Sequence, residues 1–300
     1  MHIWITGGLG FIGRALSIAL LAKNHRVTAV GRRADPEPIV HPAFGYISAD
    51  TTRSGKWQET LQEADAVFNL AGVSIFNRWN TKNKQRIRDS RILTTRNLVE
   101  ALPGDRPGLS FCSASAVGYY GNRGDDLLTE AEPPGHDFLA GIARDWEAEA
   151  FRARAKGARV IAARFGIALS PTGGALEKML RAFKSFAGGP LGDGQQWFPW
   201  IHLDDLVSAL VFALEKTVLT GPVNVCASQP VRNLDLARTL GQVLNRPAVM
   251  PAPMFVLRLA LGEMADALLN SQRVVPDKLL QHGFAFKYPV LRDALQAMVR

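Results

Sequence analysis

The glycine cluster at residues 7–13, Gly-Gly-Leu-Gly-Phe-Ile-Gly, constrains the fold most strongly. The apolar stretch at residues 2–6 before it predicts a short strand, and residues 14–22 after it are good helix formers. With a β-branched strand at residues 26–31, this order makes a βαβ unit. Glycines in such a turn let the backbone approach a pyrophosphate, which the N-terminus of the helix binds. The cluster therefore predicts a dinucleotide site at the first strand–helix junction.

These glycines fit two different spacings. Gly8, Gly10 and Gly13 match G-x-G-x-x-G, the narrower dinucleotide fingerprint. Gly7, Gly10 and Gly13 match the wider G-x-x-G-x-x-G. Both spacings require a strand before the turn and a helix after it, so the residues alone leave the register open.

Strands and helices are expected to alternate along most of the chain. The expected strands lie at residues 44–49, 64–71, 109–113, 158–163 and 222–226, and the expected helices at 83–101, 142–156 and 205–215. This alternation favours an α/β protein with a doubly wound parallel-sheet Rossmann fold. Glycine pairs and prolines become frequent after residue 168. We expect a Rossmann domain at residues 1–168, to which residues 202–226 return, and a smaller substrate-side domain at residues 169–300.

Composition excludes several classes of protein. The net charge is +8, but the basic residues are scattered, which argues against a nucleic-acid partner. No apolar run approaches the ~20 residues that span a bilayer, and His2 with the early glycines interrupts any signal peptide. Cys112 and Cys226 stand far apart, and the histidines form no i, i+4 pair. We expect a cytoplasmic protein with buried thiols, no metal site and no membrane partner.

The end of the second strand, Gly31-Arg32-Arg33, predicts the type of dinucleotide. An NAD site usually carries Asp or Glu there, about 20 residues past the glycines, to bind the ribose 2′-hydroxyl. Two guanidinium groups stand in that place, and arginine suits a 2′-phosphate. The sequence therefore predicts NADP(H). Two alternatives stay open: both arginines are solvated loop residues, or Asp35 is the expected acid.

Further candidates for cofactor contact follow the next two strands. Asp50 comes after the stretch at residues 44–49, and it either lies near the adenine or simply begins a loop. Asn69-Leu-Ala-Gly72 ends the following strand. Its small residues let the backbone lie against the adenosine ribose, although tight packing would explain them equally well.

Four segments, TGGLGFIG, GRR, FNLAG and CSASAVGYYG, resemble short-chain dehydrogenases/reductases of the extended, epimerase-like type. Later segments narrow the resemblance to the "epimerase family protein" branch, NAD-dependent epimerase/dehydratase-like proteins with a C-terminal domain of unassigned role. These segments include RW at 78–79, GGP at 188–190, WIHLDD at 200–205 and GFAF at 283–286. The resemblance spans nearly the whole chain and implies the wider glycine register, in which Gly8 completes the narrower match by accident. It implies cofactor contacts at Gly7, Gly10, Phe11, Ile12, Gly13, Arg32, Arg33, Asp50, Asn69, Ala71, Gly72, Arg91 and Ser113.

The resemblance does not extend to the usual catalytic groups. Active members of the wider family use an Asn, a Ser, a Tyr and a Lys. Their lysine, four residues after the tyrosine, lowers the pKa of the phenol and orients the nicotinamide ribose. Here the tyrosine position falls on Phe138 or Leu139, and the lysine position on Ile142 or Ala143. The asparagine position falls near Arg91, so three of the four groups are missing.

Ser115 matches the family's serine and, with Tyr119, is our candidate for catalysis. Tyr119 or Tyr120 would supply a phenol, or His136 or Asp137 would act from the loop. The structural alternatives are that the tyrosines pack the floor of the site and that His136 is solvated.

Arg164 ends a strand, and we expect it to face the substrate crevice together with Arg78, Trp79 and Arg91. These groups predict a small, anionic substrate.

We therefore expect an NADP-dependent oxidoreductase of altered mechanism, acting on a small unknown substrate. The missing Tyr and Lys favour an alternative, a non-catalytic NADP(H)-binding sensor or interaction protein. A nucleotide-sugar epimerase is a third possibility. The oligomeric state stays open, because the helices at 83–101 and 142–156 form the dimer surface of many relatives, yet the charges on the second helix equally suit solvent.

Overall fold

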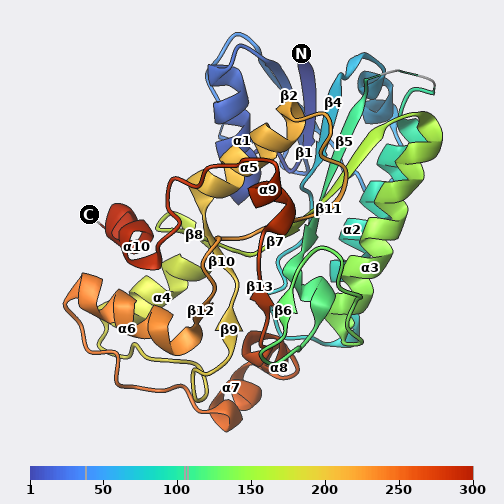
Figure 1. Cartoon of the computed structure of the whole chain (residues 1–300). Helices are drawn as coiled ribbons and strands as arrows, with labels where there is room; N and C mark the ends of the chain where they lie inside the picture. Colours follow the sequence, from blue (N-terminus) through green and yellow to red (C-terminus); the bar gives the residue numbers. More distant parts are fainter. Residues whose placement is uncertain (38, 105, 107, 300) are drawn as a thin grey trace.

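A seven-stranded parallel sheet forms the centre of the computed structural model, which describes residues 1–37, 39–104, 106 and 108–299 (Figure 1). The strand order is β3-β2-β1-β4-β5-β7-β11, and every neighbouring pair is parallel. The strands are β1 (His2–Thr6), β2 (Arg26–Gly31), β3 (Phe44–Ser48), β4 (Ala66–Asn69), β5 (Ser110–Ala116), β7 (Arg159–Phe165) and β11 (Gly221–Val225). The expected α/β class and Rossmann-like sheet are confirmed.

Strands β2 and β3 lie on one side of β1, and the later strands β4, β5, β7 and β11 lie on its other side. The strand order therefore reverses between the neighbours β1 and β4. Such a switch point opens a crevice outside the carboxyl ends of the strands, and ligands bind there in open α/β sheets. The glycine cluster follows β1 and residues 70–73 follow β4, so both segments lie at this crevice.

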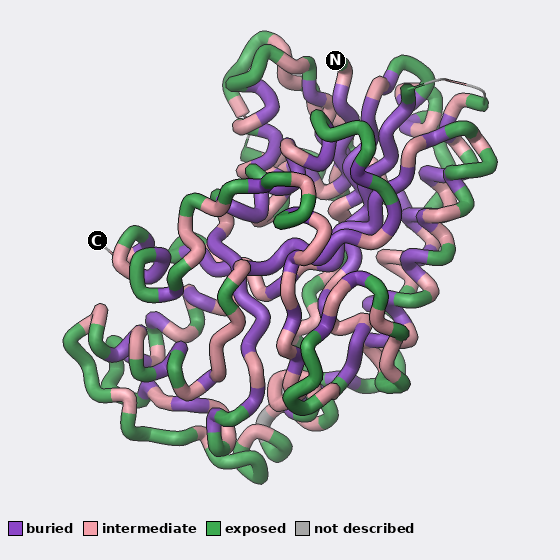
Figure 2. The backbone as a smooth tube through the Cα atoms, in the orientation of Figure 1, coloured by how far each residue is buried: buried purple, intermediate pink, exposed green. Residues whose placement is uncertain are grey.

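Helices cover both faces of the sheet (Figure 1). On one face, α1 (Phe11–Ala22) and α5 (Leu203–Glu215) bury apolar side chains such as Leu16 and Leu20 against the strands. On the other face lie α2 (Thr81–Ala101), α3 (Phe138–Phe151) and the short helix η1 (Lys56–Glu63). Figure 2 shows the sheet as the most continuously buried part of the molecule. No helix in the described part of the chain is long and apolar enough to cross a membrane.

A second hydrophobic core lies beside the sheet and is centred on Leu176, Trp200 and Leu240. The elements around it are β8 (Ile167–Ser170), α4 (Gly174–Lys184), β10 (Trp200–His202), α6 (Asn233–Leu244) and α10 (Leu291–Val299). The short elements η2 (Val117–Tyr120), β6 (Leu127–Leu128), η3 (Arg152–Lys156), β9 (Trp197–Phe198), β12 (Val231–Arg232), α7 (Met254–Leu261), α8 (Met264–Leu269), β13 (Arg273–Val274) and α9 (Asp277–Gln281) complete the fold. The division of the chain at residue 169 stays a prediction.

Helix α3 begins at Phe138, four residues before the expected start at 142. The Asp137 carboxylate accepts a hydrogen bond from the backbone N–H of Ala140 at 2.9 Å, which caps the helix there. Its expected last residues, 152–156, form the separate 3₁₀ helix η3 instead. The positions of the family's tyrosine and lysine therefore lie in the first turns of α3.

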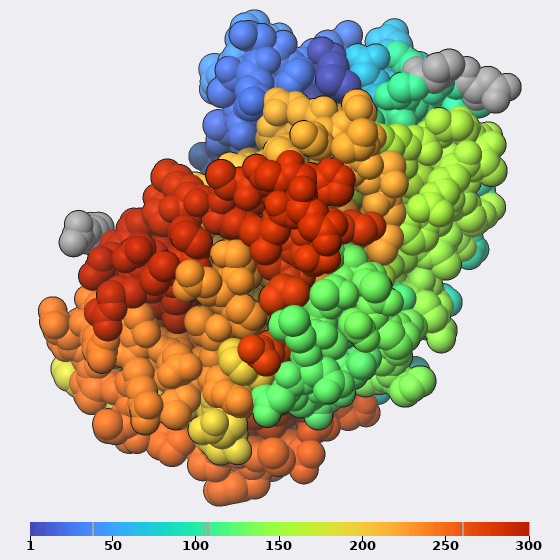
Figure 3. Space-filling view, viewed as in Figure 1, coloured from blue at the N-terminus to red at the C-terminus, as the bar shows by residue number. Residues whose placement is uncertain are grey.

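Two buried carboxylates hold the C-terminal segment onto the rest of the molecule. Asp205 accepts the backbone N–H groups of Lys287 and Tyr288, at 2.7 and 2.9 Å. Glu130 Oε1 accepts those of Asn224 on β11 and Lys278 on α9, at 3.0 and 3.2 Å. Figure 3 shows the C-terminal segment in red on the side of the molecule in view, where it lies against the green segment that includes residue 130.

Glu130 makes the stability of the fold depend on pH. Its side chain is buried, and its second oxygen, Oε2, has no hydrogen-bond partner among the residues described. Burial raises the pKa of Glu130 above its ordinary value of 4.5, although the backbone N–H groups oppose this effect. Because the folded-state pKa is raised, the stabilisation is complete below pH 4.5 and is lost as the pH rises through the folded-state pKa.

Replacing Glu130 with Gln is therefore expected to increase the free energy of unfolding relative to the native protein as the pH rises above 4.5. One proton is involved, so the difference grows by at most ~1.4 kcal/mol per pH unit. Urea unfolding between pH 4 and 8 measures it, and Glu132→Gln in the same loop serves as the control. A difference that stays constant over this range would contradict the assignment.

Candidate nucleotide-binding site

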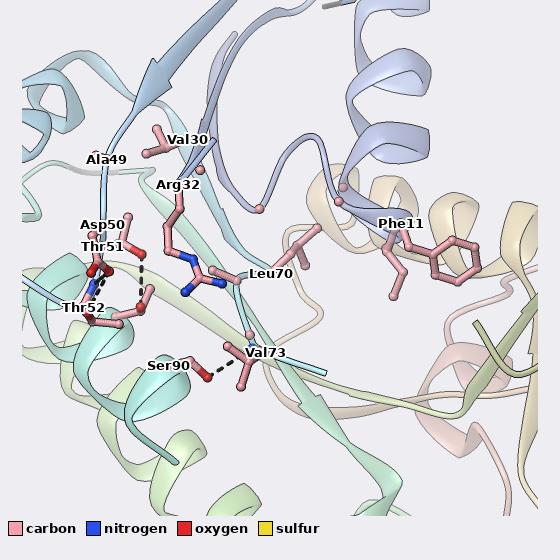
Figure 4. Close-up of a pocket in the computed structure, with 18 residues that line it drawn as sticks. Phe11, Val30, Arg32, Ala49, Asp50, Thr51, Thr52, Leu70, Val73 and Ser90 are labelled. Carbon is pink, nitrogen blue, oxygen red and sulfur yellow. Dashed lines mark hydrogen bonds between the residues drawn. The ribbon is translucent and has the colours of Figure 1, made fainter. Parts of the chain in front are cut away.

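A cavity of about 320 Å³ lies at the switch point of the sheet (Figure 4). Its size is typical of a site for a small ligand. Nine of the predicted cofactor residues line it, and these are Gly7, Gly10, Phe11, Ile12, Gly13, Arg32, Asp50, Ala71 and Gly72. The remaining lining residues are Val30, Gly31, Ala49, Thr51, Thr52, Leu70, Val73, Ser90 and Thr94.

The glycine turn is packed too tightly for side chains. Gly7 has a φ of +66°, a conformation that favours glycine. A Cβ on Gly13 would lie 2.1 Å from the carbonyl oxygen of Gly7, and one on Gly10 would lie 3.0 Å from the same oxygen. Gly8 does not line the cavity, but its Cβ would lie 2.5 Å from that of Ala29 on β2. The glycines of the wider register thus line the cavity, and Gly8 packs against β2.

Arg32 is exposed and reaches into the cavity at the end of β2 (Figure 4). Its guanidinium has no hydrogen-bond or ion-pair partner among the described residues. Arg33 does not line the cavity, and its carbonyl oxygen accepts a hydrogen bond from the hydroxyl of Tyr46 at 2.8 Å. Of the two arginines, Arg32 is therefore the one placed to contact a ligand.

Asp50 lies at the same end of the cavity as Arg32. Its Oδ1 accepts hydrogen bonds from the backbone N–H and the hydroxyl of Thr52, at 3.1 and 2.7 Å. Burial acts to raise the pKa of Asp50, but these hydrogen bonds and the charges of Arg32 and Arg53 outweigh it and lower the pKa. This carboxylate is ionised at neutral pH and begins a tight turn, as the loop interpretation of the sequence allowed.

Three predicted cofactor residues lie behind the wall of the cavity rather than on it: Asn69, Arg91 and Ser113. Asn69 is fully buried, accepting from the Thr6 hydroxyl at 2.9 Å and donating to Ser113 Oγ at 3.1 Å. The same Thr6 hydroxyl accepts the backbone N–H groups of residues 70 and 71. This network fixes the loop after β4. Direct cofactor contact by the three residues stays a prediction.

Several lining residues were missed from the sequence. Thr51 and Thr52 directly follow Asp50 at a strand end, a position that would have identified them. Ser90 and Thr94 come from α2, and Thr94 reaches the site through a hydrogen bond of 3.1 Å to Thr51. A contact between residues 43 positions apart has no local sequence signal.

Ser115, the candidate catalytic serine, is bound into a buried ionic network. Its hydroxyl donates to Glu147 Oε1 at 2.7 Å, and only 2% of the residue is exposed. Glu147 also accepts two hydrogen bonds from Arg164, at 2.8 and 2.9 Å. Burial opposes the charge of Arg164, but the Glu147 pair outweighs it and raises the pKa of Arg164. Arg164 therefore neutralises an internal carboxylate, and the expectation that it faces the crevice is wrong.

The two tyrosines differ in their surroundings. Tyr120 is fully buried, donating to Asn224 at 2.6 Å and accepting from Arg164 at 2.9 Å. Burial raises the pKa of the Tyr120 phenol, although Arg164 opposes this shift, so the phenol stays protonated at neutral pH. Tyr119 is only partly buried, and the Arg164 guanidinium lies 3.6 Å from its ring centroid. Tyr119 is the tyrosine with the more accessible side chain.

The positions of the family's tyrosine and lysine lie in an apolar cluster. Ile142 is buried with Trp79, Ile87 and Met264, and Phe138 and Leu139 pack against them. A second cavity, of about 170 Å³, lies beside this cluster. It is lined by Trp79, Asp137, Phe138, Leu139, Glu263, Asp266, Ala267 and Asn270.

The carboxylates of this second cavity already have partners. Asp137 accepts from Asn270 at 2.9 Å, Glu263 pairs with Lys84, and Asp266 pairs with Arg258. Arg78, predicted to line the crevice, is exposed and lines neither cavity. Over the described ranges of the chain, no group of three or more His, Cys, Asp or Glu residues could hold a metal ion.

Comparisons with known proteins agree with this architecture. Residues 3–226 match the model of the NAD dependent epimerase/dehydratase family, and residues 252–298 match a domain of unknown function, DUF1731. The chain is 40% identical over 303 residues to the chloroplastic epimerase family protein SDR39U1 homolog of Arabidopsis thaliana, covering 100% of this chain and 87% of the relative.

Solved structures show the same fold. The crystal structure of human epimerase family protein SDR39U1 (isoform 2) with NADPH matches 99% of both chains, with a TM-score of 0.87 and 33% identity. A UDP-glucuronic acid 4-epimerase from Bacillus cereus, in complex with UDP-glucuronic acid and NAD, matches 99% of this chain and 98% of its own. Its TM-score is 0.77, but at 20% identity it shows the fold alone. With most of the chain matching the family model, the protein described here belongs to the NAD dependent epimerase/dehydratase family.

Proposed function

We propose that this protein binds NADP(H) at the switch-point cavity and acts as an oxidoreductase on a small molecule. The observation that carries the proposal is Arg32, whose guanidinium lines the cavity after β2, where NAD sites carry an acid, and has no hydrogen-bond or ion-pair partner in the part of the chain that the structure describes. The crystallised human relative, which contains NADPH, supports the same cofactor. The bound cofactor would supply a hydride or accept one.

The chain's own residues would hold the cofactor in a defined direction. The free backbone N–H groups at the start of α1, next to Gly10, bind the pyrophosphate. Arg32 binds the 2′-phosphate, which places the adenosine half near Asp50 and Thr51. The small residues after β4, Ala71 and Gly72, would lie against the adenosine ribose.

The proposed chemistry differs from that of the wider family, because Phe138 and Ile142 cannot transfer protons. We keep Ser115 and Tyr119 as the proposed catalytic groups. Tyr119 is the partly exposed phenol near this end of the sheet, and Ser115 Oγ is joined to it through Glu147 and Arg164.

A second candidate function, a non-catalytic NADP(H) sensor or interaction protein, also has support. The Ser115 hydroxyl is already engaged with Glu147, and the positions of the tyrosine and lysine are filled by an apolar cluster. A protein built in this way would keep the nucleotide site without the proton transfer.

The Arg32→Glu substitution tests the proposed cofactor. A charge-assisted contact to the 2′-phosphate contributes roughly 1.5–3 kcal/mol, so the Kd for NADPH is expected to rise about 10- to 100-fold. Titration with NADPH and NADH should show that the native protein prefers NADPH and that the variant loses this preference. The neighbouring exposed residue Arg53, which does not line the cavity, gives the matched control Arg53→Glu. Equal affinities of the native protein for both cofactors would rule out the proposal.

A separate experiment decides between enzyme and sensor. Oxidation of NADPH at 340 nm is followed with a panel of small carbonyl compounds, using native protein and the Ser115→Ala and Tyr119→Phe variants. The enzyme proposal expects turnover that falls about 10²-fold or more in at least one variant. Tight NADPH binding without turnover supports the sensor instead. Turnover unchanged in both variants would remove Ser115 and Tyr119 as the catalytic groups.

A further inference from the structure

Arg273, the first residue of β13, differs from the other arginines of the C-terminal region in how its guanidinium is placed. Its Nε is buried and has no hydrogen-bond acceptor among the described residues. Its terminal nitrogens, Nη1 and Nη2, also lack an acceptor in this part of the chain, but they are not buried. A buried donor without a partner is uncommon in folded proteins and is costly, so its presence calls for an explanation.

A tryptophan holds this guanidinium in place. The Cζ atom of Arg273 lies 4.9 Å from the ring centroid of Trp197 on β9, and that of Arg232 on β12 lies 4.5 Å from the same centroid. The backbone N–H of Trp197 donates to Ser271 Oγ at 3.1 Å, and Arg232 pairs with Trp197 across the two strands. Figure 1 shows β9, β12 and β13 close together. Stacking on an aromatic ring uses the face of a guanidinium and leaves the N–H groups on its edge available.

Asp125 balances only one of these two arginines. Its Oδ1 accepts hydrogen bonds from Trp197 Nε1 at 2.6 Å and from Arg232 Nη2 at 3.0 Å. The hydrogen bond from Trp197 lowers the pKa of Asp125, and the charges of Arg232 and Arg273 add to this effect, so the carboxylate is ionised at neutral pH. Two positive charges therefore face one negative charge, and one positive charge is left in the cluster.

Other acidic residues close to Asp125 in the sequence are already engaged. Arg123 pairs with Asp126 at 3.3 Å and with Glu132 at 3.7 Å. In the described part of the chain, no carboxylate lies within ion-pair distance of Arg273. The surplus positive charge thus stays on a side chain that solvent and small molecules can reach.

We propose that Arg273 binds the carboxylate group of a small-molecule ligand, beside Trp197 and Arg232. Nη1 and Nη2 form the planar fork that donates to both oxygens of a carboxylate. The single surplus charge matches the single negative charge of such a group, whereas a phosphate dianion would leave the cluster negative. The inference does not depend on the proposed function, because none of these residues lines the switch-point cavity.

The tryptophans provide a direct measurement of this binding. The chain has six, and each indole N–H gives its own NMR signal. The Trp197 signal, identified by its loss in Trp197→Phe, comes from within the cluster, and the other five are internal controls. Sodium acetate is added to about 100 mM at constant ionic strength. We expect a saturable shift of the Trp197 signal, with a Kd in the millimolar range, about 1–50 mM.

Three variants test which charges are responsible. Arg273→Gln removes the fork and should raise the Kd for acetate about tenfold or more. Asp125→Asn removes the opposing charge and should lower the Kd about threefold or more. Arg238→Gln removes an exposed charge from α6 and should leave the Kd within about twofold of the native value.

Several results would overturn the inference. These are the lack of a saturable shift in the native protein, an unchanged Kd in Arg273→Gln, and weaker acetate binding in Asp125→Asn. A parallel titration with inorganic phosphate provides a further test, since tighter binding of phosphate than of acetate would contradict a carboxylate site. The effect expected for Asp125→Asn has the opposite sign, so it decides the question even if Arg273→Gln does not fold.

Discussion

Replacing Glu147 with Ala is expected to destabilise the protein by about 3–5 kcal/mol, because it leaves the buried charge of Arg164 without a partner. The two side chains are 6% and 3% exposed, so water cannot take the place of the carboxylate. The hydroxyl of Ser115 loses its acceptor in the same variant. A loss of this size is a large fraction of the stability of a typical protein. Urea unfolding at pH 7 measures it.

The double variant Glu147→Leu with Arg164→Leu provides the control for this prediction. Removing both charges together leaves no unpaired ion, so the double variant should recover much of the stability that Glu147→Ala loses. The prediction is contradicted if Glu147→Ala costs less than about 1 kcal/mol, the level expected of an exposed ion pair.

The second large effect is expected for Gly13→Ala. The new Cβ would lie 2.1 Å from the carbonyl oxygen of Gly7, which is a backbone atom, and no side-chain rotation could move the Cβ away. The start of α1 must therefore move, at a cost of roughly 2–3 kcal/mol in stability. Because this turn forms the floor of the cavity, the affinity for NADPH is expected to fall about 100-fold or more. Cofactor titration and urea unfolding of the same variant measure both effects.

Substitutions at two other glycines distinguish an effect on the affinity for NADPH from an effect on the stability of the fold. Gly8→Ala brings a Cβ to 2.5 Å from that of Ala29, outside the cavity, so it should destabilise the fold and change the affinity much less than Gly13→Ala. Gly141 in α3 has open space at its Cβ, and Gly141→Ala should stabilise the protein by about 0.5–1 kcal/mol. If Gly8→Ala weakened NADPH binding more than Gly13→Ala, the wider register would be wrong.

The features that the sequence predicted well were those set by local pattern. The strand at 2–6 and the strand at 26–31 have the predicted bounds, because apolar and β-branched residues are followed directly by glycine or charged residues. The glycine turn and Arg32 line the same cavity for a related reason: both directly follow neighbouring parallel strands, whose carboxyl ends lie at one edge.

The features that pattern could not predict depend on long-range pairing. Nothing near Arg164 indicates that Glu147 would neutralise it, since the two residues come from β7 and α3 and meet only after the helix docks. Helix α3 begins four residues before its predicted start because Asp137 caps the helix ahead of Phe138. The contributions of Ser90 and Thr94 depend on how α2 lies along the cavity.

The way in which the C-terminal segment is held has a consequence for how the chain acquires its structure during synthesis. Glu130 and Asp205 leave the ribosome well before the backbone groups of residues 278, 287 and 288 that bind them. Until those residues emerge, burying either carboxylate would leave it without enough donors, so both stay hydrated. We therefore expect nascent chains that end before residue 277 to leave both carboxylates in contact with water, and the contacts of the C-terminal segment to form only when the last tenth of the chain arrives.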